Sequence, residues 1–120
     1  MTISTTARRV VRWAVVPAAL GLGLGLTALA APSAEAAAHS CNGYRATIVG
    51  TNGSNDIEGT SGRDVIVALG GHDEIDGNGG NDIICAGAGN DEVDGGSGND
   101  WIDGGSGHDD LEGSSGKDYI

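Results

Sequence analysis

Seven aspartates recur every nine residues in the C-terminal part of the chain, and they are the side chains best placed to do chemistry. They are Asp64, Asp73, Asp82, Asp91, Asp100, Asp109 and Asp118. Asn55 occupies the same position one unit earlier. Carboxylates beside glycine-rich backbone suit a hard cation such as calcium, which takes about six to eight oxygen ligands. The spacing therefore predicts metal binding through carboxylate and carbonyl oxygens.

Other chemistries lack the residues they need. Softer metals prefer clusters of His or Cys, which the sequence does not contain. His72 and His108 directly precede repeat aspartates, which indicates solvated turn residues rather than ligands. The chain has neither a Ser/His/Asp arrangement in a supporting context nor a nucleotide-binding loop. We predict that the protein is not an enzyme.

The same nine-residue phase sets the elements that position these aspartates. A glycine stands two positions before Asn55 and before each of the seven aspartates, at Gly53, Gly62, Gly71, Gly80, Gly89, Gly98, Gly107 and Gly116. An aliphatic residue stands two positions after, at Ile57, Ile66, Ile75, Ile84, Val93, Ile102, Leu111 and Ile120. Glycine adopts positive φ easily, whereas residues around an aliphatic centre can extend. The pattern predicts that a turn and a short strand alternate every nine residues.

The units 95–103 and 104–112 match the pattern G-G-x-G-x-D-x-U-x at every fixed position, where U is aliphatic. The segment 50–120 therefore resembles the RTX, or haemolysin-type, calcium-binding nonapeptide repeat. The resemblance implies an all-β fold, a parallel β-roll of tandem nonapeptides with about four turns of 18 residues. It also implies several Ca²⁺ ions in the turns, held between loops 18 residues apart.

Carried over to this chain, the resemblance implies aspartate pairs that share each ion. The pairs are Asp64 with Asp82, Asp73 with Asp91, Asp82 with Asp100, Asp91 with Asp109, and Asp100 with Asp118. Several units depart from the pattern at their first or second position, at Thr51, Thr60, Ala68, Leu69, Asn78, Ala86 and Ser114. Carbonyl ligands survive such changes if the backbone keeps its path. We expect weaker sites there, and a weak site or a cap at Asn55.

The sequence predicts three segments. Residues 1–38 read as a secretory signal peptide, with Arg8, Arg9 and Arg12 before an apolar run and small residues at its end. The general secretory and twin-arginine routes both remain open. Residues 39–49 are a cap segment, and residues 50–120 are the β-roll. We expect a bacterial protein that is secreted to the extracellular space and has no stable membrane insertion after cleavage.

Composition excludes several partners for the segment after residue 38. It carries three basic side chains against sixteen acidic ones, so nucleic acids and anionic membranes are repelled. It contains twenty glycines and no Phe or Pro, too little for a conventional packed core. Two cysteines in an exported chain favour a disulfide between Cys41 and Cys85.

Alternate units fall on opposite sheets, which sorts the outward residues into two faces. One face is apolar, with Val65, Ile83, Trp101 and Tyr119. The other carries two carboxylate ladders, Asp56, Glu74, Glu92, Asp110 and Glu58, Asp76, Asp94, Glu112. Stacked like charges oppose folding, so we expect calcium binding and folding to be one event. The apolar ladder either supports itself as cross-strand neighbours or serves self-association or partner docking.

These observations favour a secreted calcium-binding protein whose turns bind several ions and couple binding to folding. Two alternatives remain open at this point. One is a calcium-stabilised extracellular adhesion or interaction module. The other is a repeat fragment of a larger secreted toxin or enzyme.

Overall fold

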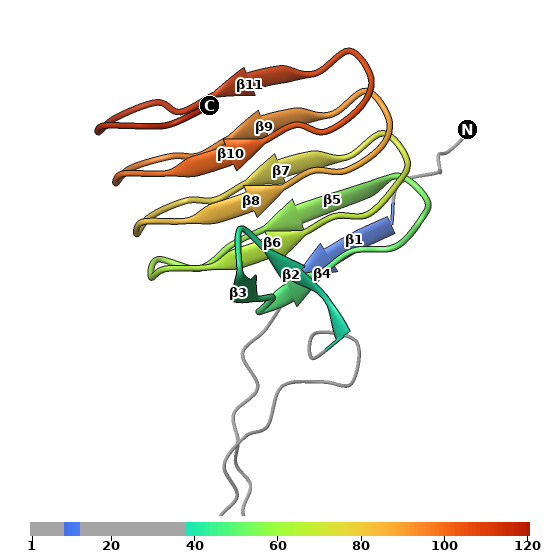
Figure 1. The fold of residues 1–120 in the computed structure, drawn as a ribbon, viewed down its shortest axis with the longest axis horizontal. Helices are drawn as coiled ribbons and strands as arrows, with labels where there is room; N and C mark the ends of the chain where they lie inside the picture. The colour runs from blue at the N-terminus through green and yellow to red at the C-terminus, as the bar shows by residue number, and fades with distance from the viewer. Residues whose placement is uncertain (1–8, 13–37) are drawn as a thin grey trace, which may run out of the picture.

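A computed structural model describes residues 9–12 and 38–120, and it shows a flattened coil of short parallel strands (Figure 1). One sheet has the order β1-β5-β7-β9-β11 and the other has the order β10-β8-β6-β4. The first contains β1 (Arg9–Arg12), β5 (Asn55–Glu58), β7 (Glu74–Asp76), β9 (Glu92–Asp94) and β11 (Asp110–Glu112). The second contains β4 (Ile48–Val49), β6 (Val65–Val67), β8 (Ile83–Cys85) and β10 (Trp101–Asp103).

The register repeats every 18 residues, as the nine-residue phase predicts for two facing sheets. Ile57 pairs with Ile75, and Ile66 pairs with Ile84. The inward aliphatic residues of both sheets form the core, with Ile48, Ile57, Ile66, Ile75, Ile84, Val93 and Ile102 all at most 2% exposed. Leu111 packs against this cluster and is partly buried. The predicted parallel β-roll is confirmed.

From the third unit onward, the close stacking of turns requires glycine at the fourth position of the unit. Gly98 has a φ of 128°, in the region that disfavours other residues. A Cβ atom added there would overlap the carbonyl oxygen of Gly80, one turn earlier. The same overlap recurs between Gly116 and Gly98. From Gly71 onward, the glycine phase of the sequence is therefore a packing requirement between successive turns.

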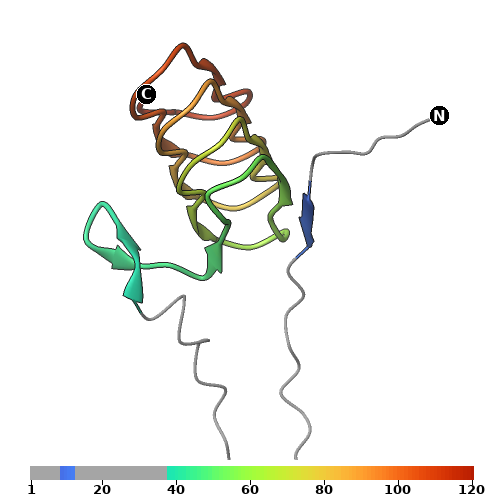
Figure 2. The same cartoon turned by 90° about the vertical axis from the view of Figure 1, so that its right-hand side faces the viewer.

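The segment before the repeats forms a small antiparallel hairpin that covers part of one sheet. Its strands are β2 (Ser40–Cys41) and β3 (Tyr44–Arg45), and it stands beside the coil in Figure 2. Cys41 and Ala46 pack with Val65, Val67 and Ile83 in a second buried cluster. The hairpin therefore acts as an apolar cover on the outer face of β6 and β8.

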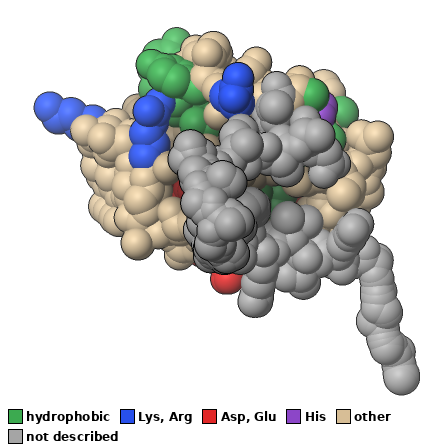
Figure 3. All heavy atoms as spheres, turned by 90° about the horizontal axis from the view of Figure 1, so that it is seen from below, with side chains coloured by type: hydrophobic (Ala, Val, Ile, Leu, Met, Phe, Trp, Pro, Cys, Tyr) green, Lys and Arg blue, Asp and Glu red, His purple; other side chains and the backbone are tan. Residues whose placement is uncertain are grey.

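This cover changes the expectation for the apolar face. Val65 and Ile83 are only 5% and 6% exposed, so neither is available for docking. Trp101 is half-buried, and Tyr119 is 68% exposed. In Figure 3, which views the molecule from below, apolar side chains gather at one edge, and little acidic surface is visible outside the grey atoms. Sequence periodicity did not reveal the cover because the hairpin lies outside the repeat.

Strand β1 lies within the segment predicted to be a signal peptide. It pairs in parallel with β5, with Val10 opposite Asp56 and Val11 opposite Ile57. The rest of that segment, residues 1–8 and 13–37, lies outside the described residues. Removal of residues 1–38 would leave β5 as the edge strand of its sheet.

Among the described residues, no helix has both the length and the apolar character needed to span a membrane.

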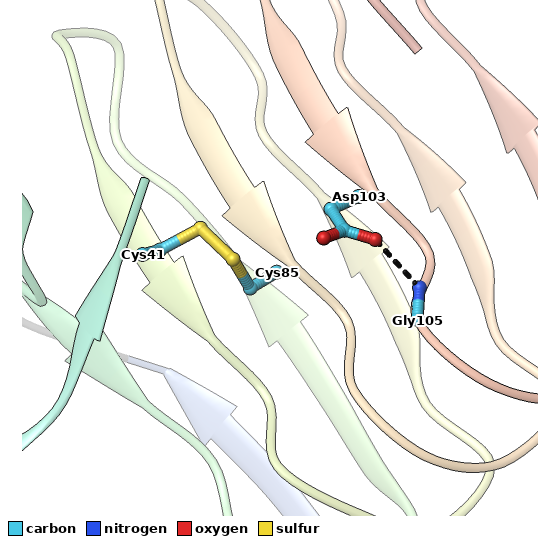
Figure 4. Close-up of a disulfide and its surroundings, with 4 residues drawn as sticks. All are labelled: Cys41, Cys85, Asp103 and Gly105. Atoms are coloured by element: carbon cyan, nitrogen blue, oxygen red, sulfur yellow. Dashed lines mark hydrogen bonds between the residues drawn. A yellow bond between two sulfur atoms is a disulfide. The ribbon is translucent and has the colours of Figure 1, made fainter. Parts of the chain in front are cut away.

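A disulfide joins Cys41 of the hairpin to Cys85 at the end of β8, as the sequence predicts (Figure 4). The Cα atoms lie 5.8 Å apart, and 44 positions separate the residues in the chain. Arg63 also contacts the hairpin, with its guanidinium carbon 4.5 Å from the centre of the Tyr44 ring. The hairpin is thus attached to the sheet covalently and through side-chain packing.

Replacing both cysteines with serine should lower the free energy of unfolding by about 3 to 4 kcal/mol, because the crosslink restricts the unfolded chain. Guanidinium titration at fixed calcium, with the reduced wild-type chain as a control, measures this difference. A loss below about 1 kcal/mol would show that the hairpin holds its place without the crosslink.

Candidate metal centre

The turns of the roll stack into two columns at opposite edges of the sheets (Figure 1). One column contains the turns 50–55, 68–73, 86–91 and 104–109, and the other contains 59–64, 77–82, 95–100 and 113–118. Successive turns in a column are joined by isolated parallel bridges, such as Gly79 to Ser97 and Ala88 to Ser106. Each turn therefore lies directly above the turn 18 residues earlier.

The structure brings together every aspartate pair that the sequence predicts. The backbone N–H of Asp82 donates to Oδ1 of Asp100 over 2.8 Å, and the N–H of Asp100 donates to Oδ1 of Asp118 over 2.8 Å. The same bond joins Asp64 to Asp82, Asp73 to Asp91, and Asp91 to Asp109. Asn55 donates to Asp73 in the same way. One oxygen of each acceptor carboxylate thereby binds the preceding turn of its column.

The second carboxylate oxygen, Oδ2, has no hydrogen-bond partner among the described residues in three of these aspartates. Asp82, Asp91 and Asp100 are 1%, 2% and 2% exposed, and their Oδ2 atoms accept no hydrogen bond from any described residue. A buried carboxylate oxygen without a partner is strongly unfavourable unless a cation or another group compensates it. The three atoms therefore mark positions where a cation fits.

Backbone oxygen atoms border the same positions. A Cβ atom added to Gly77 would lie 2.8 Å from Oδ2 of Asp82 and 2.6 Å from the carbonyl oxygen of Gly95. Carboxylate and carbonyl oxygens from successive turns thus face one small space. No three His, Cys, Asp or Glu side chains converge anywhere in residues 9–12 and 38–120. A cation in these turns would need backbone carbonyls to complete its shell, as calcium accepts and softer metals do not.

A second set of aspartates has a role that the sequence analysis missed. Asp76, Asp94 and Asp103 end their strands, and each accepts the backbone N–H of the residue two positions later, at 2.9 to 3.0 Å. Figure 4 shows this bond between Asp103 and Gly105. The sequence signal was an aspartate directly before the first glycine of a unit. By binding that N–H, these side chains keep it away from the repeat aspartate.

The departures from the repeat pattern keep the backbone path in the later units. Leu69, Asn78 and Ser114 have φ values of 77°, 69° and 61°, close to the 77° of Gly105 at the same position. Positive φ is uncommon for residues with a Cβ atom, and least so for Asn. The carbonyl positions therefore survive these substitutions, as we expected.

His72 and His108 are exposed, as predicted, but His72 also has a structural contact. Its Nδ1 accepts the backbone N–H of Asn90 over 2.9 Å, and Oδ1 of Asn90 accepts that of His108 over 2.9 Å. On the opposite column, Asn81 and Asn99 repeat this pattern. These side chains connect successive turns along the outside of each column.

Burial also raises the pKa of the central aspartates. The pKa of Asp82 rises to about 7, chiefly because burial penalises its charged form. The hydrogen bond from the backbone of Asp64 lowers this pKa, and the charges of Asp64 and Asp100 raise it further. Burial likewise raises the pKa of Asp91 and of Asp100. Without a cation, these carboxylates are poorly compensated at neutral pH.

Comparison with protein families is consistent with this geometry. The model of the RTX calcium-binding nonapeptide repeat, which spans four copies, matches residues 49–84 and again residues 85–120. The chain belongs to this family. No curated protein and no solved structure matches it. The RTX repeat accounts for the nine-residue phase, the stacked turns and the expectation of calcium as the ligand.

The raised pKa values predict that, without calcium, acidic pH stabilises this RTX roll by protonating the buried carboxylates. A group whose pKa is higher in the folded state favours folding below its unfolded value, near 3.9, and loses that contribution as pH rises through the folded value. In the presence of a calcium chelator, the strand content measured by circular dichroism should therefore fall as the pH rises from 4 to 7. Asp82→Asn, which cannot ionise, should reduce this dependence. A strand signal that increases over the same range would contradict the prediction.

Proposed function

We propose that this RTX protein is a secreted calcium-binding protein that binds several Ca²⁺ ions in its turns and folds as it binds them. The proposal rests chiefly on the buried Oδ2 atoms of Asp82, Asp91 and Asp100, which have no hydrogen-bond partner among the described residues. Asp73, Asp109 and Asp118 occupy the same position in their turns and accept the same inter-turn hydrogen bond. These six aspartates are the proposed ligands.

The charge distribution supports coupling between binding and folding. Glu74 lies between Asp56 and Glu92 in adjacent strands, and Asp76 lies between Glu58 and Asp94. Directly opposed like charges destabilise a sheet. The formal net charge of the chain is −11, so the folded roll concentrates strong self-repulsion in addition to the buried carboxylates. Divalent cations in the turns would offset both effects at once.

The proposed location rests on three features of the chain. Residues 1–38 have the charge and apolar pattern of an export signal. The Cys41–Cys85 disulfide suits an oxidising compartment. Calcium reaches about millimolar levels outside cells, in the range that weaker extracellular calcium modules use. We propose that the protein is exported before it folds around calcium, and that it has no catalytic role.

A calcium titration of the oxidised chain, followed by far-ultraviolet circular dichroism with magnesium as a control, tests this function. We expect a cooperative gain of strand signal with calcium and none with magnesium, which prefers a strict octahedral shell with several waters. Asp100→Asn should shift the calcium midpoint upward by about tenfold or more, since a carboxylate ligand is lost. Asp110→Asn, on the exposed acidic face, is the matched control. Equal midpoints for the two variants would contradict the assignment.

One observation favours a second function, a calcium-stabilised interaction module. The rings of Trp101 and Tyr119 stack with their centres 6.3 Å apart and their planes 3° apart, and Tyr119 is 68% exposed. Of the apolar ladder predicted as a docking surface, this pair is the part that the hairpin leaves accessible. Flat exposed aromatic surfaces are typical of association sites.

If this pair mediates self-association, Tyr119→Asp should convert a calcium-loaded oligomer into a monomer in sedimentation velocity. Ser115→Asp, at an exposed position in the turn that precedes Tyr119, should leave the oligomer unchanged. A wild-type chain that is monomeric throughout the concentration series would rule out self-association through this pair.

A further inference from the structure

The first turn of each column differs from the turns that follow it. Thr51 and Thr60 stand at the second position of their units, where the six later units have Leu69, Asn78, Gly87, Gly96, Gly105 and Ser114. All six later residues have positive φ, whereas the two threonines do not. A β-branched residue strongly resists positive φ. The threonines therefore impose a different turn conformation at the N-terminal end of both columns.

In these two turns, the threonine bonds to the side-chain oxygen whose counterpart in Asp82, Asp91 and Asp100 has no hydrogen-bond partner in the described part of the chain. The Thr60 N–H donates to Oδ2 of Asp64 over 2.7 Å, and Thr60 Oγ1 lies 3.0 Å from the same oxygen. Thr60 Oγ1 also accepts the N–H of Gly62 over 3.1 Å. The hydroxyl thus bonds to both the carboxylate and the backbone of its own turn. Asp64 is 4% exposed, yet its carboxylate has partners within its own turn.

The second-position N–H explains the contrast with the turns of Asp82 and Asp100. In the units that begin at residues 77, 95 and 104, this N–H donates to Asp76, Asp94 or Asp103 at the end of the preceding strand. Oδ2 of Asp82 and of Asp100 is consequently left without a donor. In the threonine turn, the N–H and the hydroxyl both face Asp64. The same amide group therefore either satisfies the repeat aspartate or leaves its oxygen free for a cation.

The other column repeats the arrangement without a charge. The Thr51 N–H donates to Oδ1 of Asn55 over 2.7 Å, and Thr51 Oγ1 accepts from the Asn55 amide over 3.0 Å. An amide cannot supply the anionic oxygen that calcium prefers. The geometry of this turn nevertheless matches that of Thr60 and Asp64. The threonine turn thus forms and is satisfied without a carboxylate.

From these contacts we propose that the first turn of each column is a calcium-free cap, in which a threonine hydroxyl bonds to the residue that binds calcium in later turns. Asp64 is then a structural hydrogen-bond acceptor and not a calcium ligand. The inference rests on the proposed function, since it distinguishes turns that bind calcium from turns that do not. The cap that contains Thr60 lies beside the disulfide-linked hairpin, where Arg63 contacts Tyr44. The hairpin and the two caps form the N-terminal end of the roll, which needs no cation.

Counting bound calcium ions by native mass spectrometry on the oxidised chain tests the proposal. Asp64→Asn reproduces the natural Thr51 and Asn55 turn, so this variant is expected to fold. It should bind as many ions as the wild type, whereas Asp100→Asn should bind fewer. Thr60→Gly restores the glycine that later units use and frees the Asp64 carboxylate. This variant should bind an additional ion, and adding Asp64→Asn to it should remove that ion.

The outcomes separate the two levels of the argument. A loss of an ion in Asp64→Asn alone, equal to the loss in Asp100→Asn, would overturn the cap and leave the calcium function intact. A Thr60→Gly chain that binds no additional ion, although it gains the same strand signal with calcium as the wild type, would also overturn it. A wild-type chain that binds no calcium at millimolar concentration would refute the proposed function and the cap with it.

Discussion

The whole roll depends on how each repeat carboxylate divides its two oxygens. Oδ1 accepts a backbone N–H from the turn 18 residues earlier, which fixes the stacking distance and the register. In Asp82, Asp91 and Asp100, Oδ2 is buried and has no hydrogen-bond partner among the described residues. Hydrogen bonds to charged acceptors are stronger than neutral ones, but a buried unpaired oxygen costs about 1 to 3 kcal/mol or more. The bond that builds the column also creates the need for a cation in the column.

The repeat phase made the fold predictable because nearly every position in it has a single physical purpose. The aliphatic residue fills the core, and Gly80 and Gly98 permit turns to stack without a Cβ between them. The aspartate pairs followed directly from the 18-residue step. The sequence could not show which turns have satisfied carboxylates, because that depends on where a single N–H points. The N–H of Thr60 donates to Asp64, whereas the N–H of Gly96 donates to Asp94 and not to Asp100, and this difference is visible only in the structure.

The hairpin was the other feature beyond sequence reasoning. Residues 39–49 have no repeat phase, so their position on the outer face of β6 and β8 followed from packing and from the Cys41–Cys85 crosslink alone. The sequence correctly placed the disulfide and the apolar ladder, yet it treated the ladder as exposed. A chain with so few large apolar residues uses Val65 and Ile83 for its second small cluster. Trp101 and Tyr119 are the part of the ladder that the hairpin does not cover.

The two ends of the roll therefore differ in what stabilises them. At the N-terminal end, threonine hydroxyls, a disulfide and an apolar cluster supply neutral or covalent contacts that are independent of ion concentration. Further along, the outer ladders of β7 and β9 place Glu74 opposite Glu92 and Asp76 opposite Asp94, while the turns bury unpaired carboxylates. In the proposed function, calcium binding offsets this repulsion and extends the roll from an N-terminal end that is organised without it.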